Sequence, residues 1–143
     1  MLMKEQSIIT NADEQRLRQT IASIEKSLPM IGDPFHRYLR ALGNQLGQSS
    51  VVSAADVDPE IITMNSKISV QELDTGKRRT VTLVYPQDTG SDGERISVLT
   101  PLGKSLLGAR VGDTIEWTAR RGPRRMWIEK IVFQPEAAGE FDL

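Results

Sequence analysis

The sequence predicts an α+β protein, with helices in its N-terminal third and a small β-sheet domain after them. Apolar residues recur every three or four positions up to about residue 46, which is typical of amphipathic helices. From about residue 67 they alternate with polar residues, which is typical of strands. Residues 47–59 in between change in composition, with three Ser, two Ala and two Asp before Pro59. We therefore divide the chain into an N-terminal helical hairpin at 1–52 and a C-terminal domain at 53–143.

The composition excludes several classes of function. The chain has no cysteine, so it offers neither a disulfide nor a thiolate. Its first residues lack the apolar core of a signal peptide, and no charge-free stretch is apolar enough to span a membrane. A net charge of −1 does not favour binding to a polyanion. We expect a cytoplasmic monomer without membrane contact, cofactor or sequence-specific nucleic-acid binding.

A first helix is expected over residues 12–28. Asn11 and Glu14 have the spacing of a capping box, with Asn in the place of Ser or Thr. An apolar stripe follows at intervals of four, three and four residues, so one face of the helix is apolar. The stripe consists of Leu17, Ile21, Ile24 and Leu28.

A second helix is expected after a break at residues 29–34. Asp33 is placed to cap it, and Pro34 fits its first position, where no backbone N–H is needed. A second apolar stripe repeats the earlier spacing and consists of Phe35, Leu39, Leu42 and Leu46. Two such helices joined by a short turn predict an antiparallel hairpin, or short coiled coil. Two uses stay open: the hairpin folds onto the other domain or dimerises, or it protrudes as a finger.

The C-terminal domain is expected to start with a β-hairpin. Its strands are residues 67–73 and 79–85, joined by a turn in which Gly76 supplies a positive φ. The polar residues 86–94 contain two glycines and are expected to form a loop.

The stretch from Ser97 to Trp117 is expected to form a strand end, a short helix, a tight turn and a strand. Thr100 is placed to cap the helix, with Pro101 at its first position. Leu102, Leu106 and Leu107 then share one face, and Gly108 suits the left-handed position after the helix end. Ile115 and Trp117 alternate with polar residues in the strand that follows.

The last strand is expected over residues 126–133, after a turn at Gly122–Pro123. Its predicted faces are Met126, Ile128, Lys130 and Val132 on one side and Trp127, Ile131 and Phe133 on the other. Four arginines flank this turn: Arg120, Arg121, Arg124 and Arg125. Charges at strand ends often only solvate an edge and oppose aggregation. The alternative is an electrostatic contact with an acidic partner surface.

A motif at residues 100–115 carries a family resemblance. Thr-Pro-Leu-Gly-x-x-Leu-Leu-Gly-x-x-Val-Gly-Asp-x-Ile resembles the C-terminal domain of the bacterial transcript-cleavage factors GreA and GreB. Residues 62–70, 82–86 and 132–140 resemble the Rnk-type regulators of nucleoside diphosphate kinase, a branch of the same family. The resemblance covers about residues 56–143, and it implies an FKBP-like antiparallel sheet with one short helix.

The resemblance also implies a partner. Gre factors dock at the rim of the secondary channel of RNA polymerase, where the loop before the short helix grips a coiled coil of the β′ subunit. That loop corresponds here to Leu99, Thr100, Pro101 and Leu102, which we call the docking loop. The finger tip of the Gre factors corresponds to Ile31, Gly32 and Asp33.

The residues do not indicate an enzyme. His36 is the one histidine, no Walker or dinucleotide motif occurs, and no Cys/His cluster suggests a metal site. Gre tips carry two neighbouring acids that help to hold a catalytic magnesium ion, whereas this turn has Asp33 alone. A 17-residue helix spans about 25 Å, and the Gre finger is roughly twice as long.

We therefore expect a regulator that competes with Gre factors for polymerase without stimulating RNA cleavage, and that is linked to nucleoside diphosphate kinase levels. The alternatives are a direct protein-binding regulator of a metabolic enzyme, or a Gre-type cleavage factor.

Overall fold

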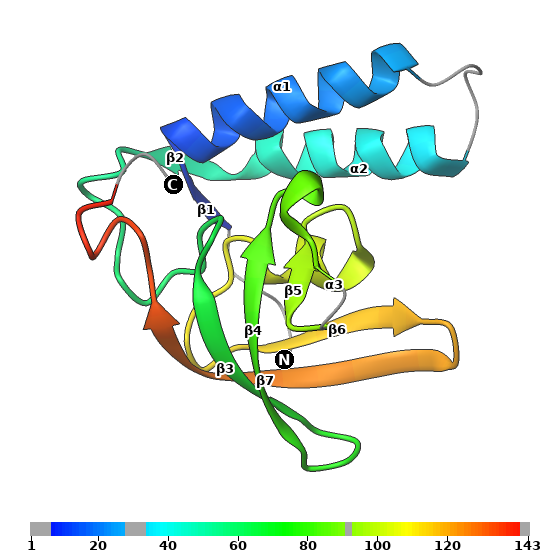
Figure 1. The fold of residues 1–143 in the computed structure, drawn as a ribbon, viewed down its shortest axis with the longest axis vertical. Coiled ribbons are helices and arrows are strands. Elements are labelled where there is room, and N and C mark those ends of the chain that lie inside the picture. Colours follow the sequence, from blue (N-terminus) through cyan, green and yellow to red (C-terminus); the bar gives the residue numbers. More distant parts are fainter. Residues whose placement is uncertain (1–6, 28–33, 91–92, 141–143) are drawn as a thin grey trace.

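Two long helices lie over one side of a curled β-sheet (Figure 1). The computed structural model describes residues 7–27, 34–90 and 93–140. The elements, in chain order, are β1 (Ile8–Thr10), α1 (Asn11–Ser27), α2 (Pro34–Gln48), β2 (Ser50–Val52), β3 (Lys67–Glu72), β4 (Arg78–Val84), the 3-10 helix η1 (Pro86–Asp88), β5 (Arg95–Ser97), α3 (Pro101–Leu106), β6 (Thr114–Ala119) and β7 (Gly122–Phe133). The α+β class predicted from the sequence is confirmed.

Helices α1 and α2 run side by side in opposite directions (Figure 1). The cap of α1 differs from the predicted one. Thr10, not Asn11, caps the helix, because the Thr10 hydroxyl oxygen accepts the backbone N–H of Asp13 at 3.1 Å. The helix therefore starts one residue earlier than predicted, directly after β1.

The apolar stripes of both helices pack inward, with one exception. Leu17 and Ile21 on α1 are buried, as are the leucines Leu39, Leu42 and Leu46 on α2. Phe35 was expected on the α2 stripe but is 36% exposed, and His36 takes the inward position next to it. Leu28 and the predicted cap Asp33 lie outside the described residues.

The main sheet has the strand order β5-β4-β3-β7-β6. Three of its strand pairs are antiparallel, but β4 and β5 pair in parallel. The expectation of a purely antiparallel sheet is therefore wrong. The chain leaves β4 through η1 and returns to pair with the second half of that strand, where the backbone N–H of Thr82 donates to the carbonyl of Glu94 at 2.8 Å. A second, two-stranded parallel sheet of β1 and β2 was not predicted.

Strand β7 is longer than predicted and carries a bulge. It starts at Gly122, and the two residues that turn the chain are Arg120 and Arg121 rather than Gly122–Pro123. Its pairing with β3 shifts between Ser69 and Val70. Ser69 pairs with Lys130 and Val70 with Ile128, so Glu129 is an extra residue in β7. It reverses the alternation of side chains. Lys130 and Val132 are therefore exposed, although they were expected on the face of the buried Met126 and Ile128.

One hydrophobic core joins the helices to the sheet. Buried residues of α1 and α2 belong to the same cluster as those of the strands, among them Leu17, Leu42, Ile68 and Ile128. The N-terminal segment lies close to the end of α3, because a Cβ at Gly108 would be 2.9 Å from the Cβ of Ser7, the residue before β1. The proposed boundary after residue 52 stays a prediction, but the packing does not follow it.

Candidate partner-binding surface

The docking loop forms a rigid, solvent-facing helix start. The Thr100 hydroxyl oxygen accepts the backbone N–H of Gly103 at 3.0 Å, and Pro101 occupies the first helical position. Both local predictions are confirmed. Thr100 and Pro101 are exposed. Because the cap satisfies one free helix N–H and the proline fixes φ, the loop needs little ordering when a partner binds.

The flanking leucines anchor this helix start to the core. Leu99 and Leu102 are half-buried and pack on the core cluster, so neither is fully exposed. Leu106 and Leu107 are buried, as the sequence predicted. The surface that the loop offers to a partner is therefore mainly Thr100 and Pro101.

Gly103 fixes the height of α3 above the end of β5. A Cβ at this position would lie 2.0 Å from the carbonyl oxygen of Ser97. Since real side chains do not approach a backbone oxygen so closely, the helix can rest on this strand end only with glycine here. The glycine thus serves close packing, and the docking loop is held at a fixed distance from the sheet.

Helix α2 holds the docking loop from the side, a contact that the sequence did not predict. The Tyr38 hydroxyl donates to the carbonyl oxygen of Thr100 and lies 3.3 Å from that of Val98. The Gln45 side-chain amide donates to the carbonyl oxygen of Lys104 at 3.0 Å. Burial raises the pKa of Tyr38, so its hydroxyl keeps the proton that these bonds need. Helix α2 is therefore linked directly to the docking loop and to α3.

Two further side chains extend this surface. The Lys104 ammonium lies 5.7 Å from the centre of the Tyr38 ring. The Phe35 ring stacks on Tyr38, with centroids 6.3 Å apart and planes at 10°. An exposed proline, a cation and a stacked aromatic pair thus gather at the junction of α2 and α3. We call this the docking surface, which consists of Phe35, Tyr38, Thr100, Pro101 and Lys104.

A buried carboxylate forms a second link between the helices and the sheet domain. Asp13 is 3% exposed, and its Oδ2 accepts the backbone N–H of Met64 at 3.0 Å. Its Oδ1 lies 3.5 Å from the hydroxyl of Tyr85. Burial raises the pKa of Asp13 to about 6, the Glu136 carboxylate adds to the rise, and the Met64 N–H and Arg16 oppose it.

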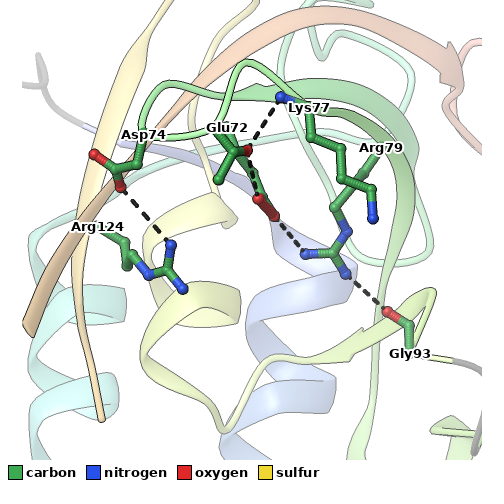
Figure 2. A network of polar contacts seen from close by, with 7 residues as sticks. Glu72, Asp74, Lys77, Arg79, Gly93 and Arg124 are labelled. Carbon is green, nitrogen blue, oxygen red and sulfur yellow. Dashed lines mark hydrogen bonds and ion pairs between the residues drawn. The ribbon is translucent and has the colours of Figure 1, made fainter. Parts of the chain in front are cut away.

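Polar contacts at the β3–β4 turn reach the loop before β5 and strand β7 (Figure 2). The Glu72 carboxylate accepts a hydrogen bond from Arg79 at 3.1 Å, and Arg79 also donates to the carbonyl oxygen of Gly93 at 3.1 Å. Asp74 in the turn pairs with Arg124 on β7 at 4.0 Å. Arg124 is one of the four arginines that the sequence places around the β6–β7 turn, and it is thus paired with Asp74. These contacts contain no arrangement typical of catalysis.

The remaining predicted positions fall in three places. The finger tip of Ile31, Gly32 and Asp33 lies outside the described residues. Arg120, Arg121 and Arg125 are exposed on the β6–β7 hairpin. His36 was expected at the surface but is 8% exposed. No group of three or more potential metal ligands occurs in residues 7–27, 34–90 and 93–140.

Comparison with known proteins assigns the family. The family described as "Transcription elongation factor, GreA/GreB, C-term" matches residues 57–133, which include the docking loop and α3. The chain belongs to the GreA/GreB family. The Escherichia coli K12 protein "Regulator of nucleoside diphosphate kinase" is 35% identical over 102 residues, which cover 71% of this chain and 75% of that protein. The resemblance read from the sequence is thereby confirmed.

Two further relatives support this membership. A GreA of Syntrophus aciditrophicus is 29% identical over 100 residues, which cover 70% of this chain and 62% of that protein. The solved structure of a GreA/GreB factor from Nitrosomonas europaea superposes with a TM-score of 0.70 at 30% identity, over 91% of this chain and all of that one. These relatives are named as regulators and elongation factors. Among the described helices, none has both the length and the apolar character that crossing a bilayer requires.

Proposed function

We propose that this chain regulates transcription by docking on RNA polymerase at the rim of the secondary channel, in competition with Gre factors. The observation that carries the proposal is the preformed helix start at Thr100–Pro101. It lies inside the matched region of the family, faces solvent and is braced from α2 by Tyr38. A rigid, exposed apolar residue beside a cation and an aromatic pair suits a compact protein contact.

In this proposal the sheet domain, with an FKBP-like form, grips the β′ coiled coil, and α1, α2 and their connection form a short finger. The hydrogen bond from Tyr38 then sets the direction of the finger relative to the grip. Helix α1 has 17 residues, so it spans about 25 Å. A finger of this length stops short of the catalytic metal ions of the polymerase, so the chain occupies the Gre site without stimulating RNA cleavage.

Two assays with purified core polymerase test this proposal. In the first, labelled GreA is displaced by increasing amounts of this chain, and we expect full displacement. In the second, stalled complexes with backtracked RNA are incubated with magnesium ions, and we expect no cleavage above the background. Failure to displace GreA would remove the docking proposal. Cleavage that disappears in Asp33→Ala would instead make the chain a Gre-type cleavage factor.

A second candidate is a direct regulator of nucleoside diphosphate kinase, which the name of the Escherichia coli relative favours. It predicts that the purified chain changes the activity of the purified kinase without polymerase present. The polymerase proposal predicts no such change, and places any effect on kinase levels at transcription.

A further inference from the structure

The β6–β7 hairpin ends in a dense group of arginines. Ala119 pairs with Gly122, so Arg120 and Arg121 alone form the turn. Arg124 and Arg125 follow within the next four residues. Arg120, Arg121 and Arg125 are exposed, and the hairpin extends well beyond the body of the sheet (Figure 1).

These three arginines differ from Arg78, Arg110 and Arg124 of the same domain, which have acidic partners. Arg78 pairs with Glu129 at 3.2 Å, and Arg110 pairs with Asp58 at 3.0 Å. Arg124 of the hairpin is tied to Asp74 (Figure 2). Within the part of the chain that the structure describes, Arg120, Arg121 and Arg125 make no ion pair, although Glu116 lies opposite Arg125 in the strand register.

The hairpin is well placed to act together with the docking surface. Its strands are anchored by the buried side chains of Ile115 and Met126. Helix α3 packs against β6, and the Ser105 hydroxyl lies 3.4 Å from the carbonyl oxygen of Glu116. The turn with Arg120 and Arg121 directly follows β6, the strand against which α3 packs, and Arg125 lies on the paired strand β7, so one partner can contact both.

We propose that this arginine turn, consisting of Arg120, Arg121 and Arg125, is a second contact with the partner that docks on α3, and that it binds an acidic protein surface there. This inference rests on the proposed polymerase docking. Unpaired arginines at a protruding turn gain from an acidic partner without first losing an internal ion pair.

The charge of the rest of the chain favours a protein over a nucleic acid as the partner of the arginine turn. The chain carries −1 overall and the four hairpin arginines contribute +4, so the remainder carries −5. A nucleic acid has a charge every few ångströms and would extend from the turn over this acidic remainder. An acidic patch on a protein is compact, and it can meet the turn without that repulsion.

The test compares two double variants of the full chain that lose the same charge. Arg120→Ser with Arg121→Ser removes two unpaired arginines of the turn. Arg78→Ser with Arg110→Ser removes two paired, exposed arginines elsewhere. Each variant displaces labelled GreA from core polymerase at low and at physiological salt, and melting temperatures confirm folding. We expect the turn variant to bind about tenfold more weakly at low salt, with a shallower salt dependence, and the control to stay within about twofold of wild type.

Each outcome decides between the two proposals. If wild type displaces GreA and the two variants behave alike, the arginine turn is not a contact, while polymerase docking stands. If wild type fails to displace GreA at any salt concentration, the docking proposal falls, and this inference falls with it. Binding of a fluorescent single-stranded RNA that is lost only in the turn variant would assign the arginines to nucleic acid and overturn the acidic-protein partner.

Discussion

Replacing Asp13 by asparagine should remove a pH dependence of stability that this buried carboxylate creates. The folded chain holds the pKa of Asp13 at about 6, against 3.8 for an unperturbed aspartate. The folded state therefore binds the proton more tightly than the unfolded state. The stability that this group contributes is full below pH 3.8 and is lost as the pH rises through 6.

The size of the effect follows from the same two values. A difference of 2.2 between them corresponds to about 3 kcal/mol, at 1.36 kcal/mol for each pKa unit. Between pH 4 and pH 7.5 the wild type should lose about 2 to 3 kcal/mol of unfolding free energy relative to Asp13→Asn. The asparagine side chain does not titrate, and its amide oxygen can still accept the Met64 N–H.

The assay is urea denaturation at a series of pH values, followed by the fluorescence of the two tryptophans. Taking the difference between wild type and variant at each pH removes the contribution of all other titrating groups. Asp56→Asn, at an exposed position, controls for the loss of one acidic side chain. A difference that is flat with pH, or that changes in favour of wild type as pH rises, would refute the reasoning.

Three further predictions follow from the packing. Leu106→Ala should cost roughly 2–5 kcal/mol of unfolding free energy, because the side chain is fully buried and leaves a cavity; a loss below 1 kcal/mol in denaturant titration would show that the site collapses. Tyr38→Phe should cost about 1 kcal/mol and weaken displacement of GreA, because the docking loop loses its bond to α2; unchanged displacement would show that the loop does not need this brace. A fragment of residues 53–143 should fold but melt at a lower temperature than the full chain, because it lacks the α1 and α2 residues of the shared core; an amide spectrum without dispersion would place the domain boundary elsewhere.

The parts of the fold that the sequence predicted are those governed by local rules. The Thr100 cap follows from the hydrogen bond of its own side chain to a backbone N–H three residues later. Gly108 has a φ of +78°, as a glycine after a helix end was expected to have. Leucines at helical spacing on α2 are buried for a similar reason, since the period of the pattern defines one face.

The missed features depend on contacts between distant segments. Tyr38 bonds to a carbonyl oxygen 62 residues away, and nothing in its local sequence indicates that bond. Asp13 was not singled out from the sequence, although its carboxylate accepts the backbone N–H of Met64, 51 residues later. The sequence did carry one unused signal, because a threonine three residues before an aspartate is a capping pattern. Recognising it would have placed the cap of α1 at Thr10, although it would not have placed Asp13 in the core.

The bulge in β7 and the parallel pairing of β5 were missed for a related reason. A single inserted residue reverses the two faces of a strand. The polar pair Glu129–Lys130 between Ile128 and Ile131 interrupts the alternation there, but it was not interpreted as an insertion. Parallel pairing of β5 depends on the path of residues 85–94, whose composition predicted a loop but not its direction.

The docking of the helix start at Pro101 on RNA polymerase is tested most directly by Pro101→Glu. Pro101 is exposed at the first position of α3, where a glutamate is compatible with the helix and favoured by its dipole. The melting temperature should therefore stay near that of wild type. Ala138→Glu, at an exposed position in the C-terminal turn, introduces the same charge away from the docking surface. We expect Pro101→Glu to displace labelled GreA from core polymerase at least tenfold less effectively than wild type, and Ala138→Glu to match wild type. Equal displacement by a folded Pro101→Glu variant and wild type would contradict docking through this helix start.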